Sequence, residues 1–99
     1  MYVVMNRVMV NSGWEDEFET RFKKRSGEIN KVTGFVSMQI LKPDAANLPF
    51  IVLTHWQDKT AFEAWVHSDD FKLAHQNPMP KEAFSEGGGL ESFNVVISA

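Results

Sequence analysis

Three residues of this chain, Asn6, Trp65 and His75, carry side chains that could form one reactive site. An imidazole such as that of His75 is the side chain that most often ligates the iron of a haem. The amide of Asn6 can donate a hydrogen bond to an oxygen atom, and the indole of Trp65 adds a broad apolar surface. Together they could build one site for a flat, iron-containing ligand.

The position of Asn6 is unusual for an amide. Val4, Val8 and Val10 would share its face of a strand, and a buried amide without a partner is unfavourable. Asn6, Trp65 and His75 also have ordinary structural explanations. An amide in a strand is commonly satisfied by neighbouring backbone, a helical tryptophan commonly fills a core, and most histidines are not ligands. The elements that carry these residues decide whether they can meet.

The length and composition predict one globular domain over residues 1–99. The chain is 43% hydrophobic, its net charge is −3, and its ten Lys and Arg residues form no basic block, so nucleic acids and anionic membranes are not expected as partners. The absence of cysteine excludes disulfides, thiol catalysis and cysteine-based metal sites. No segment approaches the about 20 apolar residues of a membrane span and no signal peptide is evident, so the expected location is the cytoplasm.

The N-terminal part of the chain predicts a strand followed by a helix. Residues 2–10 have apolar side chains on both faces of a strand pattern, so both faces must be covered. Ser12 and Glu15 form a capping box, which predicts the start of a helix. This helix should continue to Thr33-Gly34, where the glycine favours its end.

A second helical region carries both Trp65 and His75. Asp58 should cap its first part, and Ser68, followed by two aspartates, offers a new N-terminus. In one straight helix Trp65 and His75 would lie about 15 Å apart along the axis and about 80° apart around it, too divergent to reach one small point. The expected break at Ser68 allows both side chains to turn toward one broad ligand.

The remaining segments complete a β-α-β-β-α-β order. Residues 35–41 and 50–56 should pair as an antiparallel hairpin. Residues 77–89 contain two prolines and three consecutive glycines, and they predict a loop without a core of its own that could act as a lid. Residues 90–97 form the last strand. This order is that of the α+β ferredoxin-like fold, an antiparallel four-stranded sheet with helices on one face.

The first strand leaves an apolar surface that these helices cannot cover. Val3, Met5 and Met9 lie on its second face, and Met38 and Ile40 of the next strand are expected to join them. An exposed apolar sheet face of this size on a small domain predicts association. Two-fold symmetry is the commonest solution, so we expect a homodimer in which sheet packs against sheet, a dimeric α+β barrel.

Several segments distributed over nearly the whole chain match a known pattern. They are Asn6-Arg7, Arg21-Phe22, Arg25, Gly34-Phe35, Thr54-His55-Trp56, Ala61 to Trp65 and Phe71 to His75. In these segments the chain resembles the haem-degrading monooxygenases of the IsdG type, within the antibiotic biosynthesis monooxygenase superfamily. Members combine an asparagine in the first strand with a tryptophan and, nine or ten residues later, a histidine. Position by position, these catalytic residues match Asn6, Trp65 and His75.

The resemblance implies a role for each of the three residues. His75 would ligate the haem iron, and Asn6 would donate its amide N–H to oxygen on the opposite face of the haem. Trp65 would ruffle the porphyrin and so direct oxidation to a meso carbon. The reaction would use haem as both substrate and cofactor, together with O2 and electrons from a reductase or a small reductant.

Three further residues could contact the haem. Arg21 and Arg25 lie four residues apart on one helix face and could offset the charge of the haem propionates, with Phe22 packing near the ring. Solvated surface positions are the alternative for both arginines. The other two histidines, His55 and His67, are expected to be structural or solvated.

Two other functions remain open. A cofactor-free monooxygenase of the same superfamily could act on a quinol-like aromatic, with Asn6 and His75 orienting the substrate and protons. A haem-binding protein without turnover would also bind the iron through His75, but it would not oxidise the haem. The joint presence of the asparagine, the tryptophan and the histidine favours haem degradation.

Overall fold

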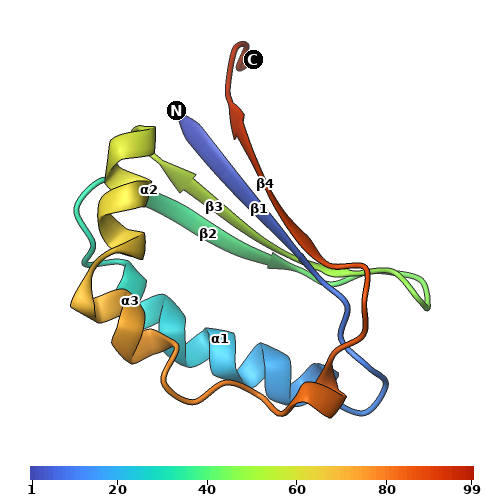
Figure 1. Ribbon diagram of the computed structural model, residues 1–99. Helices are drawn as coiled ribbons and strands as arrows, with labels where there is room; N and C mark the ends of the chain where they lie inside the picture. Colours follow the sequence, from blue (N-terminus) through green and yellow to red (C-terminus); the bar gives the residue numbers. More distant parts are fainter.

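The computed structural model describes residues 1–99 and contains a four-stranded antiparallel sheet with helices on one side (Figure 1). The strands have the spatial order β2-β3-β1-β4. The elements in chain order are β1 (Tyr2–Val8), α1 (Glu15–Ile29), β2 (Phe35–Leu41), β3 (Phe50–Trp56), α2 (Lys59–Val66), α3 (Asp69–Ala74), a short 3-10 helix (Lys81–Ala83) and β4 (Gly89–Asn94). The predicted ferredoxin-like order is confirmed, with the second helical region divided into α2 and α3.

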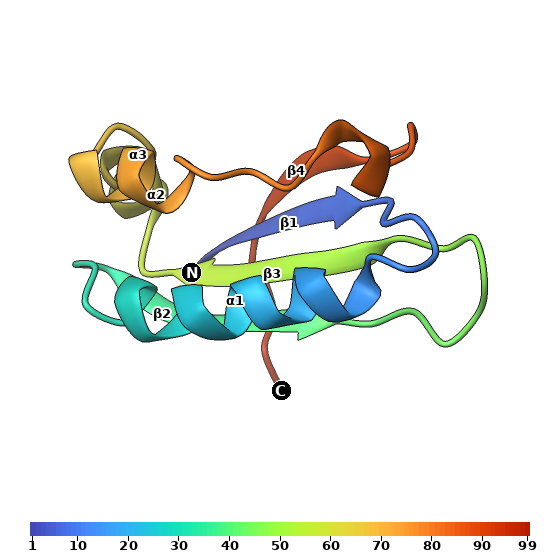
Figure 2. The same cartoon turned by 90° about the horizontal axis from the view of Figure 1, so that it is seen from below.

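The helices cover one face of the sheet and leave the other face uncovered. Figure 2 shows α1 running along the strands, while α2 and α3 lie together near one end. Side chains alternate between the two faces of a strand, so Val4 and Asn6 of β1 face the helices together with their β3 partners Thr54 and Val52. None of the helices is long and apolar enough to cross a membrane.

The core lies between the sheet and the helices in two clusters. The first cluster contains Tyr2, Val4, Ile29 and Trp56. The second contains Phe18, Phe50, Met79 and Ala83. Only nine of the 99 residues are buried, so the core that one chain builds by itself is small.

The start of α1 differs from the predicted capping box at Ser12. The helix begins at Glu15 with Trp14 at the N-cap position, and no side chain caps it. Instead, the carboxylate of Glu15 accepts a hydrogen bond from the N–H of Gly13 (3.0 Å). Three acidic residues in the first turn stabilise this end through the helix dipole. The helix also ends at Ile29, earlier than predicted.

An irregularity in β2 changes which of its side chains face the helices. The pairing of β2 with β3 shifts between Phe35 and Ser37. Met38 and Ile40 consequently pair with helix-facing residues of β3 and pack against the two core clusters. The prediction that Met38 and Ile40 lie on the uncovered face is therefore wrong.

The segment from 77 to 89 is not a free lid. Met79 and Ala83 are buried in the second core cluster, against Phe18. The backbone N–H of Asn11 also donates to the carbonyl oxygen of Ala83 (2.7 Å). As predicted, the segment has no core of its own. It contributes Met79 and Ala83 to a cluster that it shares with α1 and β3, and these contacts hold it against the domain.

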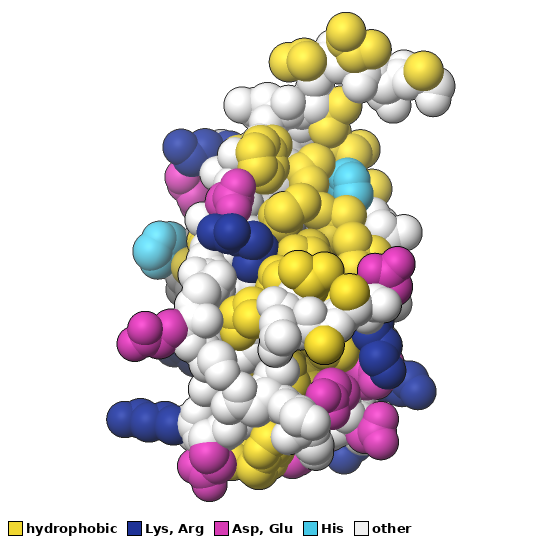
Figure 3. All heavy atoms as spheres, turned by 90° about the vertical axis from the view of Figure 1, so that its right-hand side faces the viewer, with side chains coloured by type: hydrophobic (Ala, Val, Ile, Leu, Met, Phe, Trp, Pro, Cys, Tyr) yellow, Lys and Arg dark blue, Asp and Glu magenta, His cyan; other side chains and the backbone are white.

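The uncovered side of the sheet, which we call the outer face, carries apolar side chains from all four strands. They are Val3, Met5, Leu41, Ile51, Leu53 and Phe93. Hydrophobic side chains gather on the side of the molecule where β4 lies (Figure 3). The strand β4 ends at Asn94, before the predicted residue 97, and the side chains of Val96 and Ile97 beyond it are 89% and 84% exposed. A group of neighbouring exposed apolar side chains, unlike single ones, indicates an interaction surface.

Candidate functional site

A cavity of about 340 Å³ lies between the sheet and the three α-helices, within the size range of small-molecule sites. Most of the side chains that line it are apolar, and they come from every strand and every α-helix. A few polar and charged side chains interrupt this lining, among them Asn6, Arg25, Glu28, Asp70 and His75. An apolar cavity with a few convergent polar groups is the usual form of a ligand site.

Asn6 lies in the middle of β1, where it pairs with Val52 of β3 and Leu90 of β4. Its side chain faces the helices and lines the cavity together with both partners. The amide of Asn6 is only half-buried and is open to the cavity, so it is not among the fully buried polar groups that need a partner within the chain. It can therefore form a hydrogen bond with a ligand.

Trp65 forms part of the cavity wall near the end of α2. Its ring packs on the ring of Trp56, with 5.4 Å between centroids, and meets the ring of Phe71 edge-on at 4.8 Å. Because Trp56 is fully buried, the indole of Trp65 rests against the core on one side while it lines the cavity on the other.

His75 is the C-cap residue of α3, and its exposed side chain also lines the cavity. Its ring centroid lies 6.4 Å from that of Trp65. The Nδ1 atom lies 2.8 Å from the carbonyl oxygen of Phe71. A carbonyl oxygen only accepts, so Nδ1 carries the proton in this contact, and in the neutral imidazole the lone pair is then on Nε2. This is the tautomer in which Nε2 can ligate a metal.

The predicted break between α2 and α3 is confirmed. Asp58 caps α2 and Ser68 caps α3, each by accepting a hydrogen bond from a backbone N–H, at 2.8 and 3.2 Å. The new helix start at Ser68 redirects the chain, and Trp65 and His75 consequently line the same cavity.

Two of the three predicted haem contacts on α1 also line this cavity. They are Phe22 and Arg25, and the guanidinium carbon of Arg25 lies 5.0 Å from the centroid of the Phe22 ring. Burial and the positive charge of Arg21 lower the pKa of the Arg25 guanidinium below its usual range, and the carboxylate of Glu28 partly opposes this. A half-buried cation beside a like charge favours the approach of an anion.

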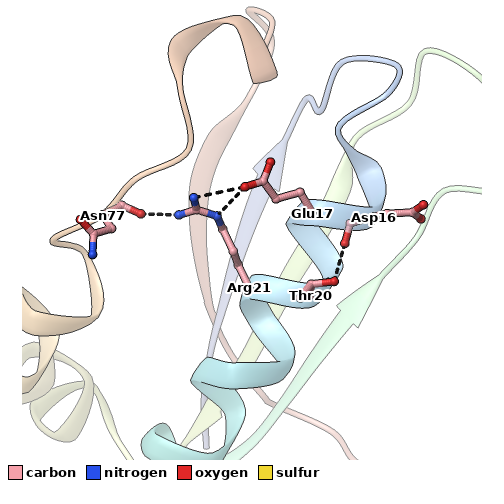
Figure 4. Close-up of polar contacts among 5 residues, drawn as sticks. All are labelled: Asp16, Glu17, Thr20, Arg21 and Asn77. Atoms are coloured by element: carbon pink, nitrogen blue, oxygen red, sulfur yellow. Dashed lines mark hydrogen bonds and ion pairs between the residues drawn. The ribbon is translucent and has the colours of Figure 1, made fainter.

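The third predicted contact, Arg21, lies outside this cavity. Its guanidinium donates to the backbone carbonyl of Asn77 and forms an ion pair with Glu17 at 3.3 Å (Figure 4). Arg21 lines an adjoining polar groove between α1 and α3, which shares Arg25 and Glu28 with the cavity. The side chain therefore ties α1 to the segment after α3.

Trp14, His55 and His67 lie away from the cavity. Trp14 packs against the second core cluster. His55 lies on the outer face, where its Nδ1 atom shares a hydrogen bond of 3.2 Å with the hydroxyl of Ser37. Neither His55 nor His67 lines the cavity.

One residue at the site was not singled out from the sequence. Phe71 precedes His75 by one helical turn, a spacing that could have indicated contact between their rings.

Comparisons with known proteins give a consistent result. The model of the antibiotic biosynthesis monooxygenase family matches residues 1–77. A staphylobilin-producing haem oxygenase of Staphylococcus haemolyticus is 40% identical over 79 residues, which cover 78% of this chain and 75% of that protein. A mycobilin-producing haem oxygenase of Mycobacterium tuberculosis is 30% identical over 95 residues, which cover 96% of this chain and 89% of that protein.

A solved structure extends the similarity to three dimensions. The haem-degrader MhuD from Mycobacterium tuberculosis, with two haems bound in its active site, aligns with a TM-score of 0.82 and 29% identity. The alignment covers 100% of this chain and 99% of MhuD. The similarity therefore includes every element that lines the cavity.

Proposed function

This chain belongs to the antibiotic biosynthesis monooxygenase family, and from that premise we propose that it is a haem-degrading oxygenase, which opens the porphyrin ring with O2 and electrons and so releases iron. One observation carries the proposal beyond family membership. A single apolar cavity is lined by the amide of Asn6, the indole of Trp65 and an imidazole, that of His75, whose Nε2 is available.

The residues present fit a haem. Nε2 of His75 is the iron ligand in the proposal, because Nδ1 already donates to the Phe71 carbonyl and the imidazole is exposed to the cavity. A hydrogen bond to the second ring nitrogen is the arrangement that orients metal-ligating histidines. The apolar lining suits a porphyrin ring, and the half-buried Arg25 offers positive charge to its carboxylates.

Bound haem would supply both the iron at which O2 is activated and the ring carbon that is oxidised. Asn6 donates its amide N–H to an oxygen atom in the cavity, which explains an amide among apolar residues in the middle of the sheet. Trp65 is backed by the fully buried Trp56, so its indole would press against a flat ligand in the cavity. Distortion of the ring is one of the ways in which a protein tunes a haem, and Trp65 would supply it here.

The proposal includes an external electron donor, either a reductase or a small reductant, because opening the ring with O2 consumes electrons and the chain has no cysteine thiol to supply them. It also includes a cytoplasmic location, since the cytoplasm is a reducing compartment.

A homodimer formed through the outer face is part of the same proposal. Apolar side chains cover this face, and the two apolar residues near the C-terminus, Val96 and Ile97, are almost fully exposed. Arg7 and Glu91 form an ion pair of 3.0 Å on the same face, which leaves no unpaired charge of either sign there to repel a second copy. Two small cores would then be joined by a buried layer between the sheets.

Titration of the protein with haemin, followed by addition of reductant under air, tests the function. We expect a Soret shift that saturates at one haem per subunit, and irreversible loss of that band once electrons and O2 are supplied. A cofactor-free monooxygenase would give no saturable shift. A haem-binding protein without turnover would give the shift and retain the band, so either result would contradict haem degradation.

A further inference from the structure

The ring of Phe71 lies between the two aromatic side chains of the proposed haem site. It stacks on the imidazole of His75, with 4.1 Å between centroids and 30° between planes. The same ring meets the indole of Trp65 edge-on, with 4.8 Å between centroids and 89° between planes. The direct separation of Trp65 and His75 is larger, at 6.4 Å, so Phe71 makes the closer contact with each of the two rings.

Hydrogen bonds fix the backbone on both sides of this ring. The hydroxyl of Ser68 donates to the carbonyl oxygen of Trp65 (2.6 Å) and accepts from the N–H of Phe71 (3.2 Å). The carbonyl oxygen of Phe71 in turn accepts from Nδ1 of His75 (2.8 Å). The four residues therefore form one continuous unit that runs from the cavity wall to the imidazole.

We propose that Phe71 is a positioning residue, which sets the plane and the tautomer of the His75 imidazole and links them to the position of the Trp65 indole. The inference rests on the proposed function of His75 as iron ligand. His75 needs such support because it is an exposed C-cap residue, beyond the last regular turn of α3. The Phe71 carbonyl selects which nitrogen is protonated, and the Phe71 ring prevents the imidazole from rotating out of that contact.

The matched pair of substitutions is Phe71→Leu and Phe62→Leu, with Phe71→Tyr as the conservative variant. Phe62 also lines the cavity, and it packs on Tyr2 and Trp56 without touching His75. Phe62→Leu therefore reproduces the loss of an aromatic ring from the cavity wall. Circular dichroism of all three variants checks that they fold.

The first measurement uses the protein without haem, in which nitrogen NMR reports the His75 tautomer at neutral to alkaline pH. Wild type, Phe71→Tyr and Phe62→Leu should show the proton on Nδ1. Phe71→Leu should show a mixture of both tautomers. A single Nδ1-protonated form in Phe71→Leu would overturn the inference, whether or not the protein binds haem.

The second measurement is haemin affinity, in the wild type and in a His75→Ala background. Quenching of the fluorescence of Trp65, which lines the cavity, reports binding even where the iron ligand and its Soret shift are lost. Loss of one aromatic stack should weaken binding by about three- to ten-fold in Phe71→Leu, and Phe71→Tyr should restore it. The same Phe71→Leu substitution should have no further effect in His75→Ala, because its action passes through the imidazole. An equal loss in both backgrounds would assign Phe71 to the cavity wall alone and overturn the positioning role. Failure of the wild type to bind haemin would instead refute the proposed function, while the tautomer experiment still decides the role of Phe71.

Discussion

The ring centroids of Trp65 and His75 lie 6.4 Å apart, although ten residues separate them in the chain. A continuous helix would point them in different directions, and the new helix start at Ser68 removes that restriction. Trp65, which packs on the buried Trp56, and the exposed imidazole of His75 consequently line the same cavity.

His75→Ala should abolish the Soret shift on haemin addition, because it removes the only histidine that lines the cavity. His55→Ala and His67→Ala are the controls and should keep the shift. Ligation requires a neutral imidazole, so wild-type affinity should also weaken as the solution is acidified. Absorbance titration measures each case, and an unchanged spectrum in His75→Ala would refute the assignment of the ligand.

The break between α2 and α3 could be predicted because local chemistry encodes it. Ser68 is followed by two aspartates, which favour a helix N-terminus through capping and through the helix dipole. The facing of Asn6 could be predicted for a similar reason, since alternation along β1 is regular. Both features depend on residues that are neighbours in the chain.

The features that could not be predicted depend on contacts between distant segments. The irregularity between Phe35 and Ser37 is set by pairing with β3, and no glycine or proline inside the strand marks it. The burial of Met79 and Ala83 depends on the helix residue Phe18, far away in the sequence. The exclusion of Arg21 from the cavity depends on the backbone carbonyl of Asn77, which no side-chain pattern reveals.

Arg25→Met should weaken haemin binding by about ten-fold, because it removes the half-buried cation from the cavity. Arg21→Met should leave the affinity nearly unchanged, since Arg21 is held by Glu17 and Asn77 outside the cavity. Haemin dimethyl ester, which lacks the carboxylates, should bind both variants as it binds the wild type. Equal losses for haemin and its ester in Arg25→Met would exclude recognition of the carboxylates.

The ligand-free stability of the same variant provides an independent check. Burial and the charge of Arg21 make the Arg25 cation unfavourable before a ligand binds, as the lowered pKa indicates. The melting temperature of ligand-free Arg25→Met should therefore equal or exceed that of the wild type. A clear decrease would mean that the contact of Arg25 with the Phe22 ring stabilises the fold more than burial of the charge opposes it.

Met5→Asp should shift the protein from dimer toward monomer or aggregate, because it places a charge in the centre of the apolar outer face. Leu73→Asp is the matched control, since Leu73 is 62% exposed on α3 and lies away from the outer face. Sedimentation velocity at micromolar concentration measures both. A wild-type monomer under these conditions would rule out the dimer.

Trp65→Phe should bind haem through His75 and degrade it more slowly or to a different product mixture, because a smaller ring presses less on the porphyrin. Phenylalanine is preferred to alanine here, since Trp65 packs on Trp56 and its removal would leave a void against the core. Trp14→Phe is the control, because Trp14 packs against the second core cluster and does not line the cavity. Resonance Raman spectra of the bound haem should report a flatter ring in Trp65→Phe alone.

Asn6→Ala should separate haem binding from haem degradation. The amide faces the cavity from the middle of β1 and is not needed by the sheet, whose pairing with Val52 and Leu90 uses backbone groups. The variant should therefore fold and show the wild-type Soret shift. One hydrogen bond to a charged oxygen is worth about 1.5–3 kcal/mol, so degradation should slow by about ten- to a hundred-fold if the bond forms only in the transition state. Single-turnover decay of the Soret band measures this rate, and decay of Asn6→Ala at the wild-type rate would leave the haem site standing without the role proposed for its amide.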